Sequence, residues 1–273
     1  MASTAHPAKR KGEPGAVPAL DPALRAALVQ YLLRLGDDRL VLGHRLSEWC
    51  GHAPILEEDI ALANIALDLI GEATLFLRLA GETEGAGRDE DALAYLREAI
   101  DYRNVLLVEL PRGDFAVTIV RHFLFGVAAY YQLEGLTRST HPALAGIAAK
   151  ALKETRYHVR HAGEWLLKLG DGTAESHGRA QAALDDLWRY TGEMFLTDAV
   201  DEILVGAGLV PDLAPLEAPW RAQVTDVVRR ATLRVPESGY MQRGGRVGRH
   251  TEHLGHLLAE MQILQRSNPG ATW

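Results

Sequence analysis

Four acidic residues, spread over four segments of helical pattern, are the residues of this sequence best suited to metal chemistry: Glu48, Asp68, Glu134 and Glu154. A carboxylate-bridged di-iron centre takes one Glu from each of two helices of an antiparallel bundle and a Glu-x-x-His pair from each of the other two. The i, i+3 spacing puts both side chains of a pair on one helix face, where they reach the same metal pair. The chemistry to be tested is therefore that of a di-iron oxygenase.

The two histidine positions of this pattern are not filled. Three residues after Asp68 stands Gly71, which has no ligand atom, and three residues after Glu154 stands Tyr157. His158 comes one position too late, and a shift of one residue turns a side chain by about 100° around a helix. We therefore interpret the acids as buried groups satisfied by Arg, Lys or His partners, and expect no metal or other cofactor on this chain. A di-iron oxygenase is the alternative.

One of these acids belongs to a thin polar line on an otherwise apolar segment. Between Glu57 and Leu79, the polar residues Asn64, Asp68 and Glu72 follow one another at intervals of four, so they share one helix face. A helix that is apolar all round is buried. We therefore expect the polar line to point at a partner inside the protein.

A glycine-bearing loop at 239–248 offers a second candidate site. Arg243, Arg246 and Arg249 lie in or beside it, and guanidinium groups could hold a coenzyme A phosphate or a partner's acidic patch. The loop lacks the spacing of a phosphate-binding Walker motif. A solvated loop is the simpler interpretation, and an anion-binding module is a further alternative for the whole chain.

Two other patterns are weaker. The histidines of His250-Thr-Glu-His253-Leu-Gly-His256 do not all share a helix face, so capping and surface pairing explain them better than zinc. Cys50 and His52 could suggest a thiol nucleophile, but no orienting Asn or Asp can be assigned to them.

Composition limits the class of protein. The chain has 273 residues with a formal net charge of −7, which argues against nucleic-acid or anionic membrane partners. A single cysteine fits a reducing compartment, no apolar run reaches the ~20 residues of a membrane span, and the first residues lack the apolar stretch of a signal peptide. We expect a cytoplasmic, soluble protein.

The elements that must position these residues are helices. No segment alternates as a strand does, and long helices joined by short turns predict an all-α antiparallel bundle. Asp21-Pro22 opens the first helix and Gly36 ends it. We expect a disordered tail over 1–20 and one domain over 21–273, with a core bundle at about 37–170 and a C-terminal helical extension at about 174–266. The core helices are expected at 37–50, 57–80, 114–138 and 142–169, and later ones at 174–195, 219–234 and 250–266.

Six ordered segments carry a resemblance to a known family. They are LGHRLSEWCGHAPILEEDIALANIALDLIGEA (42–73), DEDALAYLR (89–97), GDFAVTIVRHFLF (113–125), KETRYHVRHAGEWLLKLGDGTAESH (153–177), YTGEMF (190–195) and HTEHLGHLLAEMQ (250–262). Together they cover most of the chain beyond residue 36. The sequence resembles the C-type, structural subunits of bacterial phenylacetyl-CoA epoxidases, the multicomponent oxygenases of aerobic phenylacetate breakdown.

The resemblance implies a ferritin-like fold and a heteromeric complex. In that family the di-iron centre and the phenylacetyl-CoA site belong to the related A-type subunit, which the C-type subunit pairs with and supports. A separate reductase with FAD and an iron–sulfur cluster delivers electrons from NADPH. Gly71 and Tyr157, where histidines would be needed, agree with a C-type assignment.

Overall fold

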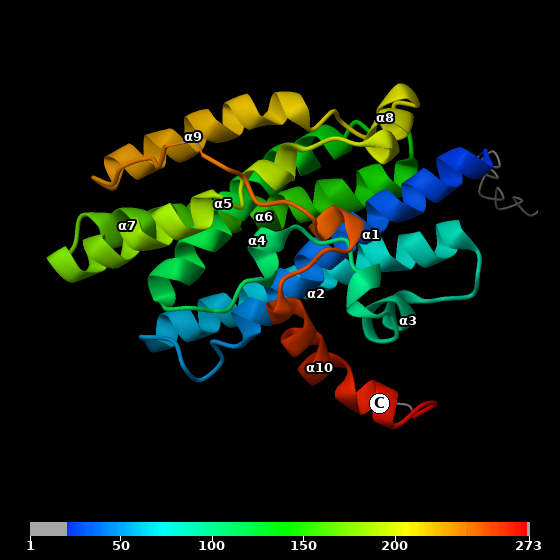
Figure 1. Ribbon diagram of the computed structural model, residues 1–273, viewed down its shortest axis with the longest axis horizontal. Helices are drawn as coiled ribbons and strands as arrows, with labels where there is room; N and C mark the ends of the chain where they lie inside the picture. The colour runs from blue at the N-terminus through cyan, green and yellow to red at the C-terminus, as the bar shows by residue number, and fades with distance from the viewer. Residues whose placement is uncertain (1–20, 238, 272–273) are drawn as a thin grey trace, which may run out of the picture.

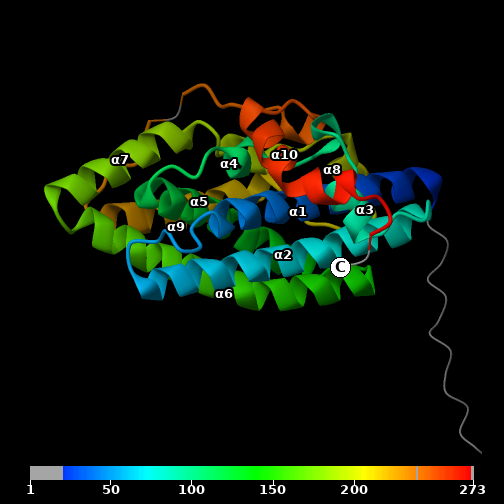
Figure 2. The ribbon, with the colours of Figure 1, turned by 90° about the horizontal axis from the view of Figure 1, so that it is seen from below.

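The computed structural model describes residues 21–237 and 239–271, so the tail expected over residues 1–20 lies outside the described residues. Within the described part the chain is all-α and contains no strand. Four long helices form a ferritin-like bundle (Figures 1 and 2): α1 (Pro22–Ser47), α2 (Leu56–Glu84), α5 (Phe115–Leu136) and α6 (Pro142–Gly170). Short loops join α1 to α2 and α5 to α6, and α2 lies beside α6 along one face of the bundle (Figure 2).

The remaining helices pack around this bundle. A crossover between α2 and α5 carries α3 (Glu90–Tyr95) and α4 (Leu106–Glu109). The helices α7 (Ala174–Trp188) and α9 (Glu217–Arg230) pack on α5 and α6, while α8 (Ala199–Gly206) packs on α1. The last helix, α10 (Glu252–Ser267), contacts α3 and α4 and points away from the bundle (Figure 1).

The predicted end of the first helix at Gly36 is wrong, because α1 runs unbroken from Pro22 to Ser47. The predicted start is confirmed, with Pro22 in the first turn. Gly36 serves packing instead of termination: a Cβ there would stand 2.7 Å from the Cδ2 atom of Leu77 on α2. The missing side chain lets α1 and α2 approach closely.

The middle of α1 holds four charged residues that are almost completely buried. Each is ion-paired with a different part of the chain: Arg34 with Asp198 and Asp201, Asp37 with Arg97, Asp38 with Arg246, and Arg39 with Glu72. Removing one partner of a buried pair leaves an unpaired charge in the interior, which costs about 3–5 kcal/mol. This part of α1 therefore fixes α2, the α3 region, α8 and the loop before α10 relative to one another.

The helix expected to be buried on every side is buried on only part of its surface. On α2 the side chains of Leu56, Ile60 and Leu67 are 72%, 56% and 66% exposed, and together with Asn64 and Gly71 they form one stripe, called the α2 face below. By length and composition alone α2 could cross a membrane, a test that core helices of soluble proteins also pass. An exposed apolar stripe of this kind marks a surface that another molecule can cover.

Candidate functional site

An arginine–glutamate pair lies in the interior of the bundle, between α1 and α2. The Arg39 Nε donates to Glu72 Oε2 at 2.6 Å, and both side chains are 1% exposed. Arg39 also donates to the Leu35 carbonyl and lies over the Phe76 ring. Burial raises the pKa of Glu72, and Arg39 only partly offsets this effect. A guanidinium thus neutralises the acid that ends the polar line of α2.

Two histidines of α6 pair with two further acids of α2. The His158 Nε2 lies 3.1 Å from Asp68 Oδ2, and the His161 Nε2 lies 2.9 Å from Glu58 Oε2. His158 is buried, whereas Asp68 is about one third exposed. Glu58, Asp68 and Glu72 of α2 therefore each bind a basic side chain of a neighbouring helix. Asn64, the third member of the polar line, is exposed.

Beside these pairs lie polar atoms with no hydrogen-bond partner among the described residues. His122 of α5 is 1% exposed, its ring centroid is 5.5 Å from that of His158, and neither of its ring nitrogens has a partner. Burial, and secondarily the charge of His158, lowers the pKa of His122 far below its usual value. Glu154 bonds to Lys150 at 3.4 Å through Oε1, while its buried Oε2 has no partner.

This donor set does not fit a carboxylate-bridged di-iron centre. A di-iron site needs several carboxylates and histidines converging on one point, and the described residues contain no group of three or more His, Cys, Asp or Glu so arranged. The Arg39 guanidinium binds one of the two carboxylate oxygens of Glu72. A Cβ added at Gly71 would meet open space, so this position does not face the cluster.

The structure gathers only part of the predicted set. Asp68 and Glu154 lie next to the interior pairs. Glu48 caps the C-terminal end of α1 and bonds to Arg45 at 2.6 Å. Tyr157 is 42% exposed, with its ring 6.3 Å from that of His158.

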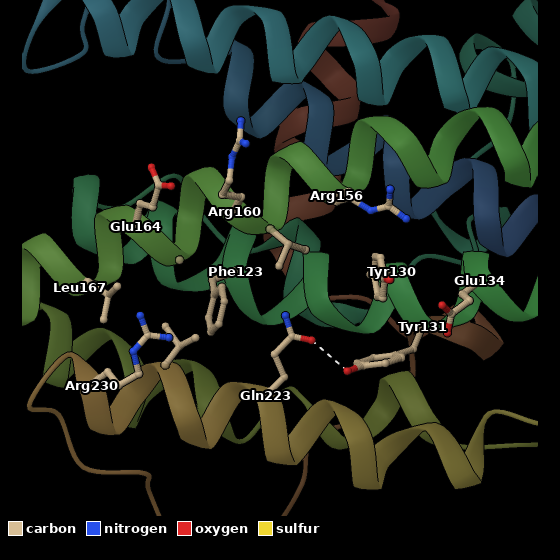
Figure 3. Close-up of a pocket in the computed structure, with 13 residues that line it drawn as sticks. Phe123, Tyr130, Tyr131, Glu134, Arg156, Arg160, Glu164, Leu167, Gln223 and Arg230 are labelled. Atoms are coloured by element: carbon tan, nitrogen blue, oxygen red, sulfur yellow. Dashed lines mark hydrogen bonds between the residues drawn. The ribbon is translucent and has the colours of Figure 1, made fainter.

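Glu134 lies on the opposite side of α5, in an outer groove of about 620 Å³ between α5, α6 and α9. Figure 3 shows Glu134 at one end of this groove, next to Tyr131, whose hydroxyl donates to Gln223 at 3.0 Å. Arg156 and Arg230 also line the groove. Glu134 is therefore separate from the interior cluster.

The three arginines of the C-terminal loop have different environments. Arg246 turns inward and binds Asp38 at 2.8 Å, which makes it unavailable to an outside anion. Arg243 and Arg249 are exposed. His250 donates to the buried carboxylate of Glu109 at 2.7 Å rather than sharing a ligand with the neighbouring histidines.

Arg39 is an interior residue that the sequence pattern did not reveal. Arg39 follows two aspartates after a glycine, a pattern typical of a helix start, and that interpretation hid its place on the buried face of a longer helix. The available signal was its position between Leu35, Leu42 and Leu46, at intervals of four and three, all fully buried. His122 follows Phe115 and Ile119 at intervals of four and three, so the sequence pattern places it on the inner face of α5, but the pattern gives no sign that His158 lies beside it.

Comparison with known proteins gives two findings. Residues 18–273 match the family model described as phenylacetic acid catabolic protein. The chain is 49% identical over 246 residues to the C component of the 1,2-phenylacetyl-CoA epoxidase of Escherichia coli (strain K12), and the match covers 90% of this chain and 99% of that relative.

Proposed function

The chain belongs to the phenylacetic acid catabolic protein family, and from this premise we propose that it is a structural subunit of a cytoplasmic phenylacetyl-CoA epoxidase complex. In this proposal the chain carries no metal and supports a related A-type subunit that holds the di-iron centre. Ring epoxidation takes place on that partner, with electrons from NADPH delivered through the FAD and iron–sulfur cluster of a reductase. The chain contributes no catalytic residue.

The pairing of Arg39 with Glu72 is the observation that carries the non-catalytic role. A metal-binding bundle keeps its inward acids free for metal, whereas here a guanidinium at 2.6 Å neutralises the most buried acid of α2. Two histidines of α6 bind Asp68 and Glu58 of the same helix. The interior is thus built to be stable without an ion.

The α2 face supports a scaffold role, because it offers a surface for another helical subunit. Its apolar side chains Leu56, Ile60 and Leu67 are spaced at helical intervals of four and seven. Gly71 presents open space on the same stripe, and small residues allow close approach of a facing helix. We propose that the A-type subunit docks here.

Docking is tested by replacing Leu67 with Glu, co-expressing the variant with the A-type subunit and measuring the dissociation constant of the complex. We expect at least tenfold weaker association, because a charge in a buried apolar contact costs more than about 1.4 kcal/mol. Leu264→Glu is the matched control, since Leu264 on α10 is 64% exposed against 66% for Leu67. Equal affinity of both variants and the unsubstituted chain would place the interface elsewhere.

Metal analysis of the isolated chain tests the alternative, a di-iron oxygenase. We expect iron far below one equivalent after expression in iron-rich medium. About two irons per chain, together with an oxygen-dependent turnover of phenylacetyl-CoA without the A-type subunit, would establish that alternative and reject the proposal.

A further inference from the structure

A cavity of about 400 Å³ lies away from the bundle interior, between the end of α7, the start of α9 and the loop before α10. Its floor is aromatic: Trp220 and Phe195 are 1% and 7% exposed, with ring centroids 5.2 Å apart. Trp188 lies behind Trp220 at 5.6 Å and stabilises its position. The volume is in the range of small-molecule sites, about 300–1,000 Å³.

The outer wall of the cavity is a loop that buried polar groups hold in place. The Glu193 carboxylate, 2% exposed, accepts from the backbone N–H of Gly244 at 2.8 Å and of Leu106 at 2.9 Å. Two residues further on, Arg246 binds Asp38 inside the protein. The loop is therefore fixed on its inner side, while Tyr240 and Arg243 remain on the cavity side.

The position of this loop also depends on a glycine. A Cβ on Gly192 would stand 2.9 Å from the side chain of Met241, which lines the cavity. The Gln242 N–H donates to the Arg189 carbonyl at 2.7 Å and ties the same stretch to the end of α7. The wall is thus positioned before any ligand arrives, which lowers the entropic cost of binding.

The charged residues that line the cavity are Arg221, Arg243 and Glu217, so one positive charge is left over. Arg243 is exposed and has no acidic or hydrogen-bond partner among the described residues. Arg221 also lines the cavity and is bound to Glu217 at 2.7 Å. Tyr240, 77% exposed, adds an aromatic ring to the same lining. Tyrosine and arginine are both enriched among the residues that dominate recognition surfaces.

We propose that this cavity binds a flat aromatic ring that carries an anionic group. The ring packs against Tyr240 and the accessible edge of Phe195, with Trp220 buried behind them, since aromatic rings pair favourably. The carboxylate or phosphate accepts hydrogen bonds from Arg243, whose planar guanidinium matches both groups. An aryl carboxylate and a nucleotide share this chemistry. The site is independent of the docking role proposed above, and either can fail without the other.

The test is calorimetric titration of the full chain with phenylacetate, adenosine 5′-monophosphate, inorganic phosphate and uncharged phenylacetamide. We expect at least one of the two aromatic anions to bind, and phosphate and phenylacetamide to bind at least tenfold more weakly. The stronger of the two aromatic anions identifies the source of the ligand.

Two variants assign the binding to this cavity. Arg243→Gln and Tyr240→Ala should each weaken the bound aromatic anion about tenfold or more, with unchanged thermal melting because both side chains are exposed. Arg249→Gln is the matched control, an exposed arginine of the same region that does not line the cavity. The proposal is overturned by phosphate binding as well as the aromatic anions, by equal effects of Arg243→Gln and Arg249→Gln, or by no binding of either aromatic anion up to about 10 mM.

Discussion

Arg39 and Glu72 neutralise each other in a place where neither has water to replace its partner. Both are 1% exposed, and the Nη2 atom of Arg39 and the Oε1 atom of Glu72 have no partner among the described residues. Such pairs stabilise less than their Coulomb energy implies, because both charges have lost their hydration. Removing either side chain alone is nevertheless destabilising, because the other charge is left buried without a partner.

Replacing Arg39 with Met should destabilise the isolated chain by about 3–5 kcal/mol, because Glu72 is left buried without a counter-charge. The double variant Arg39→Met with Glu72→Met should recover most of this loss. Urea unfolding of Arg39→Met, Glu72→Met, the double variant and the unsubstituted chain closes a double-mutant cycle. A single Arg39→Met variant within about 1 kcal/mol of the unsubstituted chain would contradict the account of the interior.

His122 makes the free energy of unfolding depend on pH. Burial lowers its pKa in the folded protein, so the unfolded chain binds the proton first as pH falls below the ordinary value of 6.5. The free energy of unfolding therefore falls as the pH falls through the range in which the unfolded chain takes up this proton. His122→Leu should raise the stability at pH 7, because two unpartnered ring nitrogens are removed, and the gain should grow by about 1 kcal/mol at pH 5.5.

Chemical denaturation at both pH values measures this difference. His256→Leu is the control, since His256 is exposed and its replacement should leave the pH dependence unchanged. An equal gain from His122→Leu at pH 7 and pH 5.5 would mean that His122 is hydrated in the folded protein.

The sequence predicted the acids of the interior better than their partners. Asp68, Glu72 and Glu154 are recognisable because they interrupt apolar helical patterns. Their partners cannot be identified locally, since Arg39 is 33 positions from Glu72 and His158 is 90 positions from Asp68. Only the fold brings such pairs together, and for this reason the sequence pattern grouped Glu48 and Glu134 with residues that they do not approach.

Among the elements, α1 shows how a packing glycine can be mistaken for a helix end. The local signal of Gly36 followed by Asp37 and Asp38 matches a stop and a new N-cap. The two aspartates instead bind Arg97 and Arg246 within one continuous helix. Long, periodic segments such as α5 and α6 were located closely from the sequence, because their caps Asp114 and His141-Pro142 are local.

Gly36→Ala should destabilise the chain by about 1–3 kcal/mol, because the new methyl group overlaps the buried Leu77 side chain. Gly178→Ala is the matched test inside α7, where a Cβ meets nothing. That substitution should stabilise by about 0.5–1 kcal/mol through helix propensity alone. Thermal unfolding of both variants decides between packing and termination: stabilisation by Gly36→Ala would show that the glycine is not needed for the contact with α2.

At the scale of the whole molecule, stability is uneven. In α5 most residues are buried, whereas α10 buries only Leu254, Leu257, Leu258 and Gln262. Segments with few buried contacts open at a lower free energy than the core. The C-terminal part of α10 also projects from the bundle (Figure 1).

Native-state hydrogen exchange should therefore show amides of α10 opening several kcal/mol below the global unfolding free energy, while those of α5 exchange only by global unfolding. The comparison is internal, because both helices belong to one sample. Equal protection of α10 and α5 would show that the molecule unfolds as a single unit under these conditions.

The ion pair between Arg39 and Glu72 also bears on whether this protein needs a metal ion to fold completely. A bundle whose inward acids need a metal folds fully only after the ion has been supplied, and chelators unfold it. Here the partners of the inward acids are side chains of the same chain, so we expect unfolding curves to be identical with and without EDTA. We expect such a subunit to fold completely after synthesis without taking up a metal ion. Under the scaffold role proposed above, a cell short of iron would accumulate folded subunit to which an iron-loaded partner could bind later.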